Sequence, residues 1–149
     1  MRRRLKNLYL LLFILPPAAL GVEWVTVWVA DSEDSSGWYS DWLVDVESLS
    51  GNEQARRAWV LINMKTTATV SSGNRRSIRM LWLIDCASDR FRRLTLSAYR
   101  GAMGTGAVIT TDSRETTWDY PPPSTATQAV LNFVCSVESS SRSRELSRR

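Results

Sequence analysis

The sequence contains few side chains suited to catalysis. It has no histidine, so the residue that most often acts as a general base near neutral pH is missing. A serine or cysteine nucleophile would lack its usual partner for the same reason. We therefore expect a protein that is not an enzyme and that uses no cofactor.

The only two cysteines are Cys86 and Cys135. In an exported chain, a single well-separated pair is expected to form a disulfide. Its closed loop of about 50 residues would add on the order of 4 kcal/mol to the free energy of unfolding in the chain-entropy model. Two buried free thiols are the alternative. We expect no zinc site, since two cysteines without histidine leave the metal's tetrahedron incomplete unless carboxylates join them.

Four carboxylates lie in or near a loop rich in serine, at Asp31, Glu33, Asp34 and Asp41. Carboxylate and serine oxygens are ligands that calcium accepts, so a calcium site is one interpretation and a solvated loop is the other. The regular spacing of a calcium-binding loop is absent. We therefore expect no metal here.

A local cluster of arginines accompanies one predicted strand, at Arg90, Arg92, Arg93 and Arg100. Such a basic strip could bind sulfated glycans, acidic segments of matrix proteins or the phosphates of lipopolysaccharide. The alternative is an ordinary solvated strand face. We take these four residues as the candidate binding site.

The N-terminus has the pattern of a secretory signal peptide. Four cations precede the apolar run 8–20, which ends in small residues at Gly21. An uncleaved anchor is the alternative, but the run is shorter than the roughly 20 residues that span a bilayer, and Pro16 and Pro17 interrupt it. We expect cleavage after Gly21, no transmembrane segment in the mature chain, and export to the periplasm or the cell surface.

The net charge of +4 comes from the two ends of the chain. The body between the signal peptide and the tail, residues 22–138, holds eleven basic and fourteen acidic residues. Export and this negative balance together argue against a nucleic-acid partner. The Ser/Arg-rich tail 139–149 has one apolar residue and is predicted to be disordered.

Alternating apolar residues predict a largely β domain. In the stretch 77–99, Ile78, Met80, Trp82, Ile84 and Cys86 fall on one parity and should face the core. A helix is predicted over 125–137, with a threonine and a glutamine at capping-box spacing. The predicted strands cover residues 23–30, 38–46, 57–65, 78–86, 91–99 and 107–111.

The connections between these elements are predicted from their turn-forming residues. The stretch 66–76 is rich in Thr, Ser and Gly and is predicted to be a mobile hairpin loop. Three glycines in 101–106 indicate a wide turn, because neither the spacing nor a following helix fits a phosphate-binding loop. The proline-rich stretch 118–124 is predicted to be an extended lead-in to the helix.

Seven tryptophans are the largest departure from average composition. We expect Trp59 and Trp82 to anchor the core. Some of the four near the beginning of the mature chain could instead form an exposed recognition patch, although core positions are the favoured interpretation. These four are Trp24, Trp28, Trp38 and Trp42, the first two of which share a parity.

Several short motifs recur in a fixed order along the chain. They are the opening Trp24, 45–49 (DVESL), 58–61 (AWVL), 76–77 (RS), 84–86 (IDC), 92–94 (RRL), Trp118, 123–124 (PS) and 134–135 (VC). In this order they resemble the surface-adhesin protein E-like domain of Gram-negative bacteria. The resemblance covers most of 24–135, and we place the domain at 22–138.

The resemblance implies an α+β fold, with a twisted antiparallel sheet of about six strands and one C-terminal helix pinned to it by a Cys86–Cys135 bridge. It also implies a binding module for host extracellular-matrix glycoproteins such as vitronectin and laminin. The namesake proteins carry a lipid-attachment cysteine after the signal peptide, and this chain has none near Gly21. That difference favours the alternative, a soluble periplasmic or envelope protein with a structural or interaction role and no host ligand.

Overall fold

The computed structural model describes residues 22–30, 40–70 and 73–146, with side chains described over 22–30, 40–65 and 74–137. The predicted signal peptide and the acidic loop with Trp38 lie outside these ranges. The described elements are strands β1 (Trp24–Val29), β2 (Ser40–Ser50), β3 (Arg56–Val70), β4 (Gly73–Asp85), β5 (Arg90–Tyr99) and β6 (Val108–Asp112), the short 3-10 helix η1 (Ala102–Gly104) and helix α1 (Ala126–Leu146).

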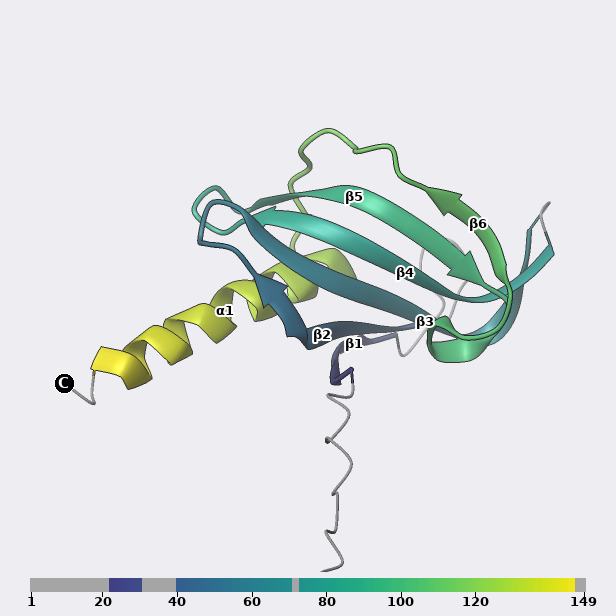
Figure 1. Cartoon of the computed structure of the whole chain (residues 1–149), viewed down its shortest axis with the longest axis horizontal. Coiled ribbons are helices and arrows are strands. Elements are labelled where there is room, and N and C mark those ends of the chain that lie inside the picture. The colour runs from purple at the N-terminus through teal and green to yellow at the C-terminus, as the bar shows by residue number, and fades with distance from the viewer. Residues whose placement is uncertain (1–21, 31–39, 71–72, 147–149) are drawn as a thin grey trace, which may run out of the picture.

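The six strands form one sheet in the order β1-β2-β3-β4-β5-β6, and each strand is antiparallel to its neighbours. Figure 1 shows the sheet as a twisted layer with α1 lying against one face. The predicted α+β fold is therefore confirmed. Among the helices that the structure describes, none has the length and apolar character needed to cross a membrane.

The long hairpin of β3 and β4 corrects the prediction of a loop over 66–76. Both strands continue into this stretch, where Ala68 pairs with Arg75 and Val70 with Gly73. The threonines and valine of 66–70 have high strand propensity, and the antiparallel partner satisfies their backbone groups. Only residues 71–72, at the tip, lie outside the described chain.

The core lies between the sheet and α1. Ile78, Met80, Trp82 and Ile84 all belong to it, as their shared parity predicts, and Trp82 is only 2% exposed. From α1 the core receives Val130, Leu131 and Val134, which are fully buried or nearly so.

Helix α1 begins beside Thr125, whose side-chain oxygen accepts a hydrogen bond from the Gln128 N–H at 3.2 Å. This is one half of the predicted capping box, since the Gln128 side chain donates to Asn132 instead of reaching back. The helix continues to Leu146, beyond the predicted end at 137 and into the tail predicted to be disordered. The sequence 138–146 contains no glycine or proline that would stop it.

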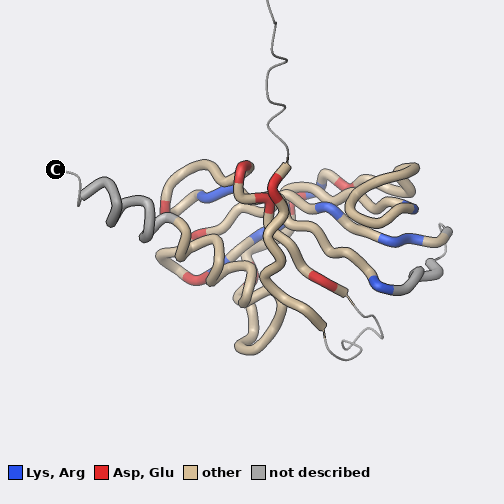
Figure 2. Tube along the Cα trace, turned by 90° about the horizontal axis from the view of Figure 1, so that it is seen from below, with Lys and Arg blue, Asp and Glu red and all other residues tan. Residues whose placement is uncertain are grey.

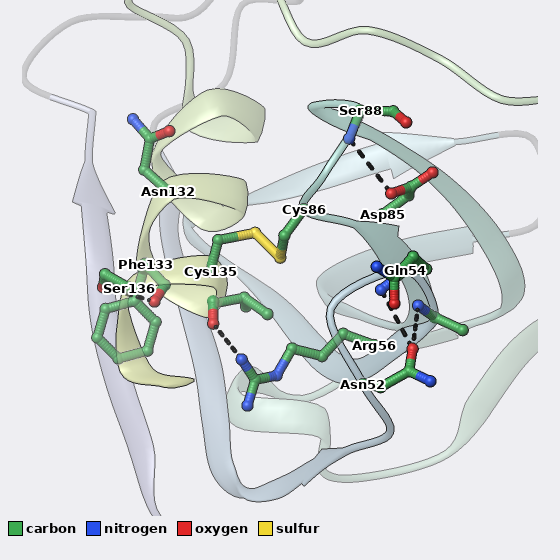
Figure 3. Close-up of a disulfide and its surroundings, with 12 residues drawn as sticks. Asn52, Gln54, Arg56, Asp85, Cys86, Ser88, Asn132, Phe133, Cys135 and Ser136 are labelled. Atoms are coloured by element: carbon green, nitrogen blue, oxygen red, sulfur yellow. Dashed lines mark hydrogen bonds between the residues drawn. A yellow bond between two sulfur atoms is a disulfide. The ribbon is translucent and has the colours of Figure 1, made fainter. Parts of the chain in front are cut away.

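The Cys86–Cys135 disulfide joins the end of β4 to α1, with Cα atoms 5.6 Å apart, and confirms the predicted pairing (Figure 3). Beside it, the guanidinium of Arg56 donates a hydrogen bond to the carbonyl of Val134 at 3.1 Å. The covalent link and this bond fix the helix to two neighbouring strands.

Candidate functional site

The sheet face turned away from α1, which we call the outer face, carries a mixture of aromatic, aliphatic and basic side chains. Residues paired directly across antiparallel strands point to the same face, so the pairs of β3 with β4 define its membership. On the outer face lie Trp24, Leu43, Asp45, Arg57, Trp59, Leu61, Arg79, Leu81, Leu83 and Arg92, of which Leu43, Asp45 and Leu61 are buried.

Arg79 lies at the centre of the outer face, against two tryptophans. Its guanidinium carbon is 4.5 Å from the Trp59 ring centroid and 5.8 Å from that of Trp24. A guanidinium over an indole face is held by the ring quadrupole, and Trp gives the strongest such contact. Within the described side chains neither Arg79 nor Arg57 forms an ion pair. No carboxylate of the described chain is therefore within ion-pair distance of either guanidinium, although the buried Asp45 shares this face with Trp24 and Trp59 through its strand pairing.

A second cluster surrounds Trp118 at one end of the outer face. The guanidinium carbons of Arg90 and Arg92 lie 4.6 Å and 5.1 Å from its ring centroid. Both arginines also have carboxylate partners, Asp85 for Arg90 at 3.0 Å and Glu115 for Arg92 at 3.1 Å. The positive charges of Arg90 and Arg92 are thus neutralised by these carboxylates. The two side chains contribute to the outer face mainly through the shape of its surface.

Asp85 is buried, being only 5% exposed. Burial by itself raises the pKa of its carboxyl group, but hydrogen bonds from Ser88 and Arg90 and the charge of Arg90 outweigh burial and hold the pKa below its ordinary value. Asp85 is therefore a carboxylate at neutral pH, and it fixes Arg90 beside the first residues of β5.

The structure separates the four arginines that the sequence analysis grouped together. Arg93 pairs with Trp82 across the strands and so lies on the helix side, since a bulge at Leu94 interrupts the alternation. Arg100 follows the opposite end of β5 and is exposed. Only Arg90 and Arg92 remain together on the outer face. Figure 2, with Lys and Arg in blue, shows basic positions distributed over several strands.

Sequence reasoning missed Arg57 and Arg79, two cations of the outer face that form no ion pair within the described side chains. They come from β3 and β4, far apart in the sequence. The sequence does contain a signal for their position, because residues two apart in a strand lie on the same face. Arg57 is two residues from Trp59, and Arg79 is two residues from Leu81.

The tryptophans also divide between the two faces. Trp82 is a core residue as predicted, whereas Trp59 is half-buried on the outer face, so its prediction as a core anchor was wrong. A register shift in β1 places Trp24 on the outer face and Trp28 opposite Trp42 on the helix side, although the two share a parity in the sequence. A bulge adds one residue to a strand and so reverses which face later residues occupy.

The glycine-containing stretch 101–106 forms a turn, as predicted, and covers one end of the outer face. The Met103 N–H donates to the Asn63 side chain at 2.8 Å, and the Gly104 N–H donates to the Ser77 hydroxyl at 2.9 Å. These two N–H groups are therefore engaged with the sheet. Leu61, close to Gly104, is fully buried.

Comparison with known protein families identifies the family of this chain. A family model described as surface-adhesin protein E matches residues 24–136. The chain belongs to this family. Among curated proteins, none matches the sequence.

Solved structures of protein E from Haemophilus influenzae share the fold. The structure of protein E from the non-typeable organism has a TM-score of 0.55 and 15% sequence identity, covering 83% of this chain and 82% of that chain. A further Haemophilus influenzae protein E structure has a TM-score of 0.56 and 14% identity, covering 83% of this chain and 91% of that chain. At these identities the likeness concerns the fold.

Proposed function

We propose that this protein is an exported, non-enzymatic binding module that holds an acidic segment of a host extracellular-matrix glycoprotein on the outer face. The observation that carries the proposal is the position of Arg79, stacked on Trp59 and close to Trp24, without a carboxylate partner in the described chain. Membership of the surface-adhesin protein E family supports a binding role of this kind.

The chemistry of the outer face fits an acidic protein segment. A guanidinium that stacks through its plane keeps its N–H edge available, and that edge binds a carboxylate through two parallel hydrogen bonds. Trp and Arg are the residues that most often dominate binding energy at protein interfaces. The half-buried Leu81 and Leu83 add apolar area around them.

Surface plasmon resonance on immobilised vitronectin and laminin tests this proposal. We expect Arg79→Gln to weaken binding about tenfold and Arg57→Glu by a similar factor, because each removes a cation from the centre of the outer face. Arg100→Glu is the matched control, since Arg100 is exposed but lies beyond the end of β5; it should leave the dissociation constant within about twofold. Equal losses in all three variants, or none, would contradict the proposal.

The cell-surface location is tested separately. Protease treatment of intact cells that make the protein should digest the domain if it faces the outside. Protection in whole cells, with release in the periplasmic fraction, would exclude host contact and leave a structural or interaction role within the envelope.

A further inference from the structure

A groove of about 500 Å³ lies on the helix side of the sheet, between β4–β5 and the chain that follows β6. That chain runs beside β5, where the Thr116 N–H donates to the Arg93 carbonyl at 3.0 Å and the Asp119 N–H donates to the Phe91 carbonyl at 2.8 Å. The wall of the groove is therefore fixed by backbone hydrogen bonds. Its volume lies within the range of small-ligand sites in proteins.

One part of the lining is aromatic. Trp82 and Phe91 stack with ring centroids 4.3 Å apart and planes inclined by 24°, and both line the groove. Because Trp82 is only 2% exposed, the half-buried Phe91 supplies the accessible aromatic surface, and the face of an aromatic ring carries negative partial charge that attracts the polarised C–H groups of a ligand. The Nε1–H of Trp82 is buried and has no hydrogen-bond acceptor within the described residues, which is costly unless an acceptor is supplied.

The opposite wall is polar and offers both donors and acceptors. Thr116 and Thr117 carry hydroxyl groups, and Asp119 carries a carboxylate. Arg93 adds a guanidinium that uses one nitrogen for Asp112 at 2.9 Å, while its Nε has no hydrogen-bond partner in the described chain. A ligand with several hydroxyl groups needs such a mixture, because each hydroxyl both donates and accepts.

Asp112 forms ion pairs with two arginines, Arg93 and Arg114. Arg114 donates to it from its backbone N–H at 3.0 Å and from its guanidinium at 3.1 Å. These hydrogen bonds from Arg114 and the charges of Arg114 and Arg93 hold the pKa of Asp112 below its ordinary value. One carboxylate is thus shared by two cations, so Arg93 keeps positive charge that an anionic ligand can use.

We propose that this groove binds an acidic saccharide, with a sugar ring against Phe91, which stacks on Trp82, its carboxylate on Arg93, and its hydroxyl groups on the threonines and Asp119. The combination of an aromatic lining, polar groups of both kinds and one partly compensated cation matches a uronic acid better than an apolar or a neutral ligand. Trp118 lines the groove and also contacts Arg90 and Arg92 of the outer face. The strand residues that line the groove lie on the helix side, so the proposal does not rest on the function proposed above.

Isothermal titration calorimetry with the mature protein tests the groove. The probes are a hyaluronan tetrasaccharide, which alternates glucuronic acid with N-acetylglucosamine, and chitotetraose, a neutral sugar of the same length. We expect the hyaluronan fragment to bind about tenfold more tightly than chitotetraose, because only it carries carboxylates for Arg93.

Two variants in the groove and one away from it locate the binding. Thr117→Tyr places a ring in the groove without changing charge, and Arg93→Gln removes the cation; each should weaken the hyaluronan fragment about tenfold. Arg100→Gln, at an exposed position beyond the other end of β5, should change affinity by less than about twofold. Thermal unfolding checks each variant, and Thr117 is exposed, so at least one groove variant should fold normally.

Three results would overturn the proposal. They are no heat of binding with either sugar, equal affinity for the charged and the neutral sugar, and a loss in Arg100→Gln equal to that in Arg93→Gln. None of these results bears on matrix-protein binding at the outer face, which is measured with different ligands and variants.

Discussion

The two faces of the sheet are built from the same strands but have different chemistry. On the helix side, apolar residues from β2, β3 and β4 meet α1, and the core residues Val60, Ile84 and Val134 have no exposed surface. On the outer face the intervening residues include the half-buried Trp59, Arg79 and Leu81 and the exposed Arg57, while Leu43 and Leu61 are buried. Alternation along each strand therefore separates the packed interior from the surface proposed for binding within a single layer.

The contrast shows where substitutions can be tolerated. A change on the helix side alters a packed interior and a disulfide, so it should act mainly on the free energy of unfolding. A change on the outer face alters an incompletely buried surface, so it should act mainly on binding. Each prediction below tests one side of this division.

The largest expected difference is between two leucines. Leu131→Ala, in α1, should lower the free energy of unfolding by about 3 kcal/mol, because it leaves a cavity in the core. Leu81→Ala, on the outer face, should cost about 1 kcal/mol, because that side chain is only half-buried. Urea denaturation of the two variants measures both values. Equal losses would mean that the outer face is packed as tightly as the core.

The second-largest effect on the free energy of unfolding is expected from removing the disulfide. Replacing Cys86 and Cys135 with serine should lower the free energy of unfolding by about 2–4 kcal/mol, since the unfolded chain regains the freedom of a long loop. Below the melting temperature the double variant should still bind matrix protein with the affinity of the parent, because the bridge lies on the helix side. Loss of binding in a folded double variant would show that the faces are coupled.

Asp85 gives a smaller effect with a defined pH dependence. Its folded pKa is lowered, so its contribution is complete above the ordinary pKa of aspartate and is lost as the pH falls through the folded pKa. Asp85→Asn should therefore cost about 1–2 kcal/mol at neutral pH, and this cost should shrink in acid. Glu23→Gln, at an exposed position, is the control. A cost for Asp85→Asn that is independent of pH would exclude the ion pair as its origin.

The smallest effect on stability should come from Arg57. Arg57→Gln should change the free energy of unfolding by no more than about 0.5 kcal/mol, because the side chain is exposed and forms no ion pair in the described chain. The same variant should nevertheless weaken matrix-protein binding. A large change in melting temperature measured by circular dichroism would show instead that Arg57 stabilises the folded protein.

The sequence predicted the presence of each strand and of the helix and much of the core, but not the extension of β3, β4 and α1 beyond their predicted ends. The parity of Ile78, Met80, Trp82 and Ile84 predicted the buried face of β4, because a regular strand alternates strictly. The same rule failed for Trp24 and Trp28, which a bulge in β1 separates. Bulges depend on pairing with the neighbouring strand, and a local pattern does not contain that information.

The candidate sites were only partly predictable. Arg90, Arg92 and Arg93 are close in the sequence, yet strand alternation and the bulge at Leu94 place Arg93 on the other face. The centre of the outer face joins Arg57, Arg79 and Trp24 from three separate strands, and only the register brings them together. The groove depends on the chain after β6 returning along β5, a long-range contact without a local signal.

Oxidative footprinting of the tryptophans in the complex with vitronectin distinguishes the two faces of the sheet. Bound vitronectin should protect Trp24 and Trp59, on the outer face, while Trp28 and Trp42 on the helix side oxidise as in the free protein. Protection of Trp28 and Trp42 with no change at Trp24 and Trp59 would contradict the proposed binding on the outer face.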